Sequence, residues 1–291
     1  MITTRKKPDW LRINLPKADE YSYLKQYLNK YNLHTICESG NCPNIGECWN
    51  NRTATFMILG NICTRSCGFC AVATGKPLPP DTEEPQKLAE VISQMKLKHC
   101  VITSVDRDDL TDGGAEIWAQ TVTAIKKINP KTTIETLIPD FKGNTENIKK
   151  IIESSPDIIS HNLETVERLT KQVRVQAKYS RSLDMLKYIS SNGVKTKSGI
   201  MLGLGETENE IFKTMDDMLN AGCSIITLGQ YLQPTKKHLP VDRYVTPEEF
   251  AKFKLIALEK GFEFAECGPL VRSSYHAEKH VGTERSRCKS S

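Results

Sequence analysis

Short apolar runs alternate with amphipathic stretches along most of the chain after residue 53. Six of the runs are short, apolar and partly β-branched, as buried parallel strands are. We expect strands at Ala54–Leu59, Cys100–Val105, Thr132–Ile138, Asp157–Asn162, Lys195–Leu202 and Ile225–Leu232. Helical spacing lies between them, for example over residues 117–125 and 211–219. Repeated strand–helix alternation indicates βα units and a parallel sheet.

Six βα units are fewer than the eight of a closed barrel, so we predict a partial (βα)6 barrel of the TIM type. An open doubly wound sheet is the alternative, although no GxGxxG follows the first strand. A last helix should start at Thr246-Pro247 and stop at Gly261, with one more strand at Phe262–Cys267. We divide the chain into an N-terminal arm (1–52), the partial barrel (53–240) and a C-terminal helix with a closing segment (241–291).

Composition limits the class of protein. The chain has 291 residues, of which 38% are hydrophobic and 26% charged, as in globular proteins. The net charge of +5 is weak support for an acidic partner, but no basic cluster alternates with aromatic residues as a nucleic-acid groove requires. No apolar run is long enough for a membrane span, and residues 1–9 do not resemble a signal peptide. We therefore expect a cytoplasmic protein that binds neither nucleic acid nor membrane.

Cysteines are concentrated in one part of the sequence. Six of the ten fall between Cys37 and Cys70, which is typical of metal ligation in a reducing compartment. Cys63, Cys67 and Cys70 follow the first predicted strand with C-x3-C-x2-C spacing. Thiolates suit zinc or iron–sulfur clusters, but a structural zinc ion needs four ligands. Three cysteines therefore favour a [4Fe–4S] cube with one open iron over zinc or free thiols.

A second triad precedes the first strand. Cys37, Cys42 and Cys48 lie in a stretch that Gly40, Pro43 and Gly46 should keep as a loop. A zinc ion completed by a remote cysteine is the alternative here. A second iron–sulfur cluster is favoured, because the first one follows within twenty residues.

Polar side chains follow the carboxyl end of each predicted strand, where βα barrels form their active sites. These groups are Cys63–Cys70, Ser104–Asp109, Glu135 with Asp140, His161–Glu164, Gly203–Glu206 and Gln230-Tyr231. Each group alone is typical of a solvated loop, and Gly113-Gly114 is typical of a helix start. Their common placement predicts a ring of polar groups around one cavity.

Several motifs resemble the lipoyl synthase family of radical S-adenosylmethionine (SAM) enzymes. They are the two cysteine triads, Thr103–Leu110 with Asp112–Ala115, and Arg272-Ser273-Ser274-Tyr275-His276. The resemblance runs from about Cys37 to Ala277. Biotin synthase is the nearest rival, and His161–Thr165 resembles a SAM-binding motif found there too, but it has no triad like Cys37–Cys48. An iron–sulfur electron carrier or a zinc-binding module would leave the barrel without a purpose.

The resemblance implies two [4Fe–4S] clusters. The cluster on Cys63, Cys67 and Cys70 would bind SAM, which an electron from reduced ferredoxin or flavodoxin cleaves to a 5′-deoxyadenosyl radical. The radical takes hydrogen from C6 and C8 of an octanoyl chain on a lysine of a lipoyl carrier domain or the glycine-cleavage H protein. The second cluster, on the other triad, would donate both sulfur atoms.

Further residue roles follow from the same resemblance. Phe69 should lie near the adenine of SAM, and Asn162 and Glu164 should contact its ribose or methionine part. Ser274 should be the fourth ligand of the second cluster, although spacing alone favours Cys267 or Cys288, and then His276. A hard serine ligand on one iron would help that iron to leave. The basic residues considered for docking an acidic carrier are Lys279, Arg285, Arg287 and Lys289.

Overall fold

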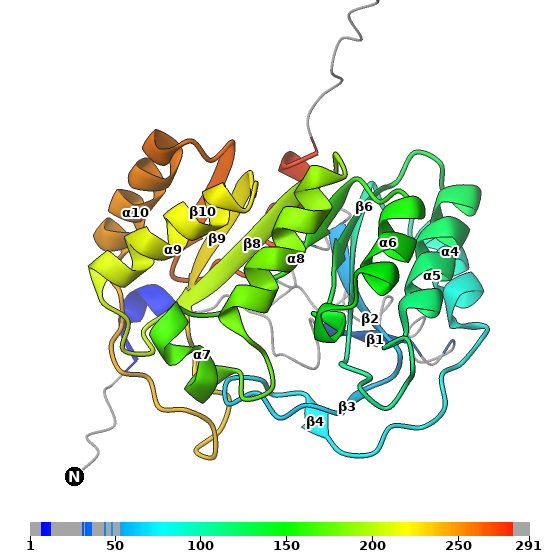
Figure 1. Cartoon of the computed structure of the whole chain (residues 1–291), viewed down its shortest axis with the longest axis horizontal. Coiled ribbons are helices and arrows are strands. Elements are labelled where there is room, and N and C mark those ends of the chain that lie inside the picture. The colour runs from blue at the N-terminus through cyan, green and yellow to red at the C-terminus, as the bar shows by residue number, and fades with distance from the viewer. Residues whose placement is uncertain are drawn as a thin grey trace, which may run out of the picture.

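An eight-stranded sheet curves through the molecule in the order β1-β2-β5-β6-β7-β8-β9-β10 (Figure 1). The structure is a computed structural model that describes residues 7–12, 31, 33–36, 44, 48 and 53–281. The strands are β1 (His34–Thr35), β2 (Thr53–Ile58), β5 (His99–Ser104), β6 (Thr133–Leu137), β7 (Ile158–Ser160), β8 (Lys195–Leu202), β9 (Ile225–Gln230) and β10 (Phe264–Gly268).

Neighbouring strands are parallel except β1, which runs antiparallel to β2. β1 and β10 are the two ends of the hydrogen-bonded order, so the described sheet does not close. The prediction of a partial barrel is therefore confirmed. All six predicted strands are present, and β10 adds a seventh parallel strand at the position where one more was expected.

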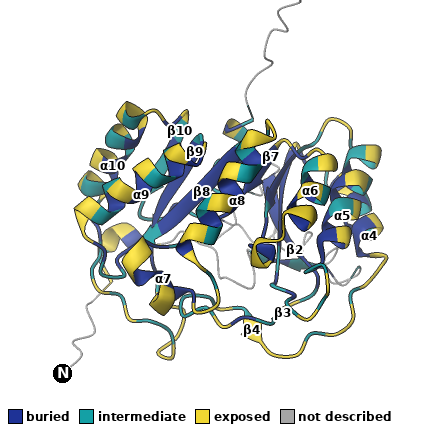
Figure 2. Ribbon diagram, viewed as in Figure 1, coloured by how far each residue is buried: buried dark blue, intermediate teal, exposed yellow. Residues whose placement is uncertain are grey.

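Helices cover the outer face of the sheet. They are α4 (Glu84–Gln94), α5 (Ala115–Ile128), α6 (Thr145–Glu153), α7 (Glu167–Val173), α8 (Tyr179–Ser191), α9 (Glu208–Asn220) and α10 (Pro247–Lys260). Short 3-10 turns form η1 (Asp9–Leu11), η2 (Phe141–Gly143) and η3 (Ala277–Lys279). Figure 2 shows that the helices turn their buried sides to the sheet and their exposed sides outward. α10 begins with a capping box at Thr246 and ends at Gly261 with φ 114°, as its sequence predicts.

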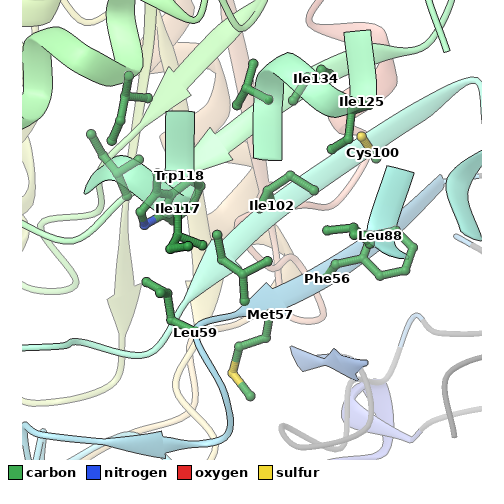
Figure 3. Packing of buried hydrophobic residues seen from close by; sticks show 14 of the residues in the cluster. Phe56, Met57, Leu59, Leu88, Cys100, Ile102, Ile117, Trp118, Ile125 and Ile134 are labelled. Atoms are coloured by element: carbon green, nitrogen blue, oxygen red, sulfur yellow. The ribbon is translucent and has the colours of Figure 1, made fainter. Parts of the chain in front are cut away.

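Two apolar clusters hold the helices to the sheet. The first joins β2, β5 and β6 to α4, α5 and α6, and Figure 3 shows Phe56, Ile102 and Trp118 packed within it. The second joins β8, β9 and β10 to the later helices and includes Phe250 and Phe253. Burying one side chain of this size stabilises the fold by roughly 2 kcal/mol. The barrel wall is therefore a rigid support for the loops at its carboxyl ends.

Residues 269–281, which we call the C-terminal strap, bridge the two ends of the open sheet. On one side the backbone carbonyl of Leu270 accepts a hydrogen bond from Asn44 (2.7 Å), and Glu278 accepts one from Thr53 (3.4 Å) at the start of β2. On the other side the ring of His280 lies 5.4 Å from that of Phe264 in β10. The strap thus spans the gap that hydrogen-bonded strands leave open.

The floor of the barrel, at the amino ends of the strands, carries a buried ion pair. Lys197 Nζ lies 2.9 Å from Glu135 Oε2, and both side chains are fully buried. Ser160 donates a further hydrogen bond to Glu135 (2.7 Å). The prediction that Glu135 belongs to the ring at the opposite end is wrong. Side chains alternate between the two faces of a strand, so Glu135 points inward like Leu137 but one layer lower.

Some expectations lie outside the described residues. They include most of the N-terminal arm and the ligands Cys37 and Cys42. The division of the chain at residues 52 and 240 stays a prediction. None of the helices in the described ranges combines the length and apolar character that crossing a membrane demands.

Candidate metal and cofactor site

A cavity of about 590 Å³ opens at the carboxyl ends of the strands. Its walls combine apolar side chains such as Leu137 and Ile200 with polar and charged ones such as Gln230 and Arg174. The predicted site residues that line it are Cys63, Cys67, Phe69, Cys70, Asn162, Glu164 and Ser274. The cysteine loop, the end of β7 and Ser274, which are three separate parts of the sequence, therefore meet in one cavity. The first two follow strand ends, as the common placement of polar groups predicts.

The loop with the three cysteines is clamped at its base and at its tip. At the base, the short strands β3 (Ile62–Cys63) and β4 (Ala73–Thr74) pair in parallel. At the tip, the Gly68 N–H donates to the carbonyl of Val173 at the end of α7, and the Gly68 carbonyl accepts from Leu239 (both 3.0 Å). These anchors fix a stretch that would otherwise be a long free loop, so the sulfur atoms are positioned before any ligand binds.

The surroundings of the cysteines fit an iron–sulfur cluster. Backbone N–H groups of Arg65 and Asp106 point at Cys63 Sγ from 3.4 Å and 3.3 Å, and such donors stabilise thiolate ligands. Burial raises the pKa of Cys67 to about 12 and that of Cys70 to about 11, so iron must displace their protons. Within the described ranges no three His, Cys, Asp or Glu side chains converge to hold a single ion. A cube presents several irons, so its thiolates need not converge on one point.

Arg65, between two of the cysteines, ties this loop to the barrel. Its buried guanidinium contacts three carboxylates, at 3.3 Å from Asp106 and at 2.7 Å from both Asp108 and Asp140. Burial by itself would lower the pKa of Arg65, but the hydrogen bond to Asp108 and the other two carboxylates raise it overall. Arg181 also contacts Asp140, at 2.9 Å. The network joins the loops after β2, β5 and β6.

The end of β7 has an unusual backbone conformation at a predicted site residue. Glu164 has φ 64°, in the left-handed region that a side chain of this size rarely adopts. Hydrogen bonds hold it there: its N–H donates to Gly199, and its carbonyl accepts from Met201 (both 2.9 Å). Strain of this kind is concentrated at functional sites. It turns Glu164 toward the cavity beside Asn162, which donates to Glu164 Oε1 (3.1 Å).

The C-terminal strap reaches the same place. Asn162 Nδ2 donates to Ser273 Oγ at 2.6 Å, across 111 residues of sequence. The hydroxyl of the neighbouring Ser274 has no hydrogen-bond partner among the residues the structure describes. Cys267, an alternative ligand from spacing, packs instead against the outer cluster between sheet and helices. Cys288 lies outside the described residues, and the ring of His276 stacks on Tyr275.

The N-terminal triad is described only in part. Cys48 is half-buried and packs against the first apolar cluster, which Cys63 also borders. Cys37 and Cys42 are outside the described residues, while Ile36, next to Cys37, lines the cavity. The assignment of this triad to a second cluster therefore stays a prediction.

Two predicted polar groups turn away from the cavity. Glu206 accepts hydrogen bonds from the backbone N–H groups of Gly203 (2.6 Å) and Leu204 (2.9 Å), so it shapes its own loop. Arg107 pairs with Asp109 (2.9 Å) and donates to the carbonyl of Leu59. Gly113 and Gly114 directly precede α5, as expected for a helix start. Gly114 has φ 86°, and its α-carbon packs against the Leu59 side chain.

Sequence reasoning missed three residues of the site. Arg65 lies within the Cys63–Cys70 motif and Ser273 within the Arg272–His276 motif, so their place in these motifs could have pointed to them. Arg174 had none: it is buried after α7, donates to the carbonyl of Leu163 and to Ser182, and lines the cavity. Burial raises the pKa of Glu164, and the positive charge of Arg174 opposes that shift.

Comparison with known proteins bears on the same residues. Residues 57–218 match the family model described as the radical SAM superfamily. Among solved structures, the [FeFe]-hydrogenase maturase HydG superposes with a TM-score of 0.57 at 12% identity, covering 85% of this chain and 68% of that one. SuiB from Streptococcus suis bound to S-adenosylmethionine gives 0.56 at 14% identity, with coverages of 89% and 58%. These two likenesses show the fold.

Curated relatives are much closer in sequence. "Lipoyl synthase, mitochondrial" from Nematostella vectensis is 60% identical over 94% of this chain and 95% of its own length. "Lipoyl synthase" from Christiangramia forsetii is 59% identical over 96% of both chains. The matched length covers nearly the whole chain, and the chain has the cysteine loop, the β7 motif and the strap described above. The chain therefore belongs to the lipoyl synthase family of the radical SAM superfamily.

Proposed function

We propose that this protein inserts two sulfur atoms at C6 and C8 of a protein-bound octanoyl-lysine, and so makes the lipoyl cofactor. The observation that carries the proposal is the meeting of the cysteine loop, the β7 end and the strap in one cavity. A radical reaction at unactivated C–H bonds needs a space that excludes water and other hydrogen donors. The apolar side chains in the cavity wall, such as Leu137 and Ile200, contribute to this exclusion.

SAM and one [4Fe–4S] cluster are the cofactors that membership of the radical SAM superfamily implies. We assign Cys63, Cys67 and Cys70 as the ligands of this cluster, with one iron left for SAM. When bound there and reduced, such a cluster would supply the electron for reductive cleavage of SAM. The protein's part is to hold the loop rigid through Gly68 and Arg65 and to keep the site dry.

Three side chains are proposed to contact SAM. The Glu164 carboxylate and the Asn162 amide can bond the hydroxyl or amino groups of SAM, because both project from a strand end into the cavity. Phe69, which also lines the cavity, can pack on the adenine. The Asn162 side chain also donates hydrogen bonds to Glu164 and Ser273, which hold it at the cavity wall.

The second cluster and its ligands are also part of the proposal. Cys37, Cys42 and Cys48 would hold a [4Fe–4S] cluster that provides the sulfur atoms. Ser274 would complete it, which is supported by its place on the cavity wall and by the outward packing of Cys267. Ser273, next to Ser274 in the chain, accepts a hydrogen bond from Asn162, so the proposed cluster ligand and the proposed SAM contact would be directly linked.

The substrate would be an octanoylated lipoyl carrier domain or the glycine-cleavage H protein, and the electron donor reduced ferredoxin or flavodoxin. Clustered thiols favour a reducing location, and we propose the cytoplasm. The name of the Nematostella vectensis relative makes the mitochondrion the alternative to test.

Anaerobic incubation with SAM, dithionite and an octanoyl-lysine peptide tests the activity, with mass analysis of the peptide. Cys67→Ala should abolish both 5′-deoxyadenosine and product, whereas Cys42→Ala should still cleave SAM but insert no sulfur. Cys100→Ala is the matched control, because this buried cysteine packs in the first apolar cluster and should change neither product by more than about twofold. Normal SAM cleavage by Cys67→Ala would refute the ligand assignment.

A further inference from the structure

The rim of the cavity concentrates positive charge that the fold itself does not use. Six lysines lie on the segments that surround the opening, and all six are exposed: Lys7, Lys76, Lys171, Lys178, Lys236 and Lys237. None of them forms an ion pair with any residue that the structure describes. Most other basic groups near strand ends, such as Arg65 and Arg107, are engaged with carboxylates.

The positions of these lysines follow from their neighbours. Lys7 lines the cavity, and Lys178 adjoins Ala177, which also lines it. Lys236 and Lys237 follow the lining residues Gln233 and Pro234. Lys76 comes directly after β4 and Lys171 lies in α7, the two elements that flank the cysteine loop at the mouth of the barrel in Figure 1.

Carboxylates on the same segments do little to balance this charge. Asp9 pairs with Arg12 at 2.7 Å, and Asp81 and Glu83 both pair with Lys87, at 2.8 Å and 3.1 Å. Asp242 is exposed and offsets one of the six lysines. Among the residues that the structure describes, the rim therefore carries a positive excess.

Exposed apolar side chains gather at the same end of the molecule. Of the five large apolar residues that the described chain exposes, Leu78 (80%), Val175 (61%) and Trp10 (42%) belong to rim segments. Apolar contacts surrounded by charged groups are typical of the surfaces that bind protein partners. The rim thus combines two features that solvent alone does not explain.

We infer that the lysine rim is the docking surface for the folded carrier domain, and that this domain is acidic around its octanoylated lysine. The inference rests on the proposed function. The octanoyl chain is attached to a lysine on the surface of the carrier. When the chain enters the cavity, the surface around that lysine must therefore lie against the rim. Six unpaired lysines there attract a negative surface and repel a positive one.

The opposite end of the barrel supplies a matched control. Lys98 and Lys131 precede β5 and β6, and Lys279 lies in η3 at the floor, and all three are exposed. None of these three has an ion pair with a described residue either. Lys279, one of the basic residues considered for docking from sequence, therefore lies at the end away from the cavity.

The experiment compares two triple variants with equal charge change. The rim variant carries Lys76→Glu, Lys171→Glu and Lys236→Glu, and the floor variant carries Lys98→Glu, Lys131→Glu and Lys279→Glu. For each, kcat/KM is measured on the intact octanoylated carrier domain and on a short octanoyl-lysine peptide, over a range of salt concentration. We expect the rim variant to lose about tenfold or more on the carrier at low salt, and less than about twofold on the peptide. The floor variant should change little on either substrate.

Equal losses in the rim and floor variants on the carrier would overturn the proposal, since total charge would then be responsible. Equal losses of the rim variant on carrier and peptide would overturn it too, because the lysines would then act on the cavity. Failure of the proposed function is distinguishable, because the unmodified protein would then convert neither substrate.

Discussion

At the scale of single residues, Arg65 shows how one side chain organises a site without binding the reactants. Its guanidinium is 5% exposed and holds three carboxylates from two different loops. Replacing it by alanine removes the ion-pair partner of Asp106 and leaves buried Asp140 with Arg181 alone, and breaking a buried pair in this way costs up to about 3–5 kcal/mol. We expect Arg65→Ala to lose the SAM cluster, measured as iron and sulfide per chain and as the visible absorption of the purified protein.

The control for this prediction is Arg168→Ala, which removes an exposed ion pair with Glu210. Such pairs contribute less than about 1 kcal/mol, so its iron content should match the unmodified protein. Arg65→Lys should lie between the two, because lysine keeps the charge but loses the planar fork. An Arg65→Ala protein with full iron content would show that the network does not hold the loop.

At the scale of elements, Gly229 determines how closely the C-terminal strap approaches β9. A methyl group on Gly229 would lie 2.2 Å from the carbonyl oxygen of Val271, a backbone atom that cannot rotate away. We expect Gly229→Ala to displace the strap, and limited proteolysis should then cut residues 269–281 much faster. Gly75→Ala is the control, since its nearest contact would be an ordinary 3.4 Å from a side-chain methyl of Ile62.

The buried pair on the barrel floor joins β6 to β8. Lys197→Met leaves Glu135 charged and unpaired in a place without solvent, so unfolding free energy should fall by roughly 3–5 kcal/mol. Removing both charges, as in Glu135→Gln with Lys197→Met, should cost less than the lysine change alone. Urea unfolding of the two single variants and the double variant measures this coupling. Additive losses would mean that the pair contributes nothing beyond its separate side chains.

The sequence predicted the helices and strands better than it predicted how high along the barrel axis each inward side chain lies. β8 has the predicted bounds because its apolar residues Ile200–Leu202 end at a turn that begins with Gly203, at φ 99°. Periodicity gives the face of a strand but not the height within the barrel, so Glu135 was placed at the wrong end. β7 is only three residues long because the chain leaves the strand for the left-handed turn at Glu164. The Arg65 network was not predictable, since it needs Asp140 from 75 residues away.

At the scale of the whole molecule, buried histidines make stability depend on pH. Burial lowers the pKa of His161 to about 4, aided by the charge of Arg174, and burial also lowers the pKa of His99 to about 4. The unfolded chain takes up these protons near pH 6.5 and the folded chain only near pH 4. Stability from these groups is therefore complete above pH 6.5 and is lost as pH falls toward 4, by roughly 2 kcal/mol per histidine at pH 5.

Glu84 works in the opposite direction, since burial raises its pKa to about 7 and its contribution fades as pH rises through that value. The comparison of variants separates the two effects. His99→Gln should reduce the loss of unfolding free energy between pH 7.5 and pH 5, measured by urea unfolding under anaerobic conditions. An unchanged pH slope in His99→Gln would mean that folding does not lower the pKa of this histidine.

The C-terminal strap also bears on how copies of the chain behave toward one another. A sheet that does not close has two edges with unpaired backbone groups, and such edges join readily with those of another molecule. Here residues 269–281 reach both sides of the opening, through Thr53 in β2, next to the edge strand β1, and through Phe264 in the edge strand β10. A chain that ends at Gly268 would have an intact set of parallel strands and two exposed edges. We expect it to form concentration-dependent aggregates, visible by light scattering, so that the last residues keep the protein dispersed as well as closed.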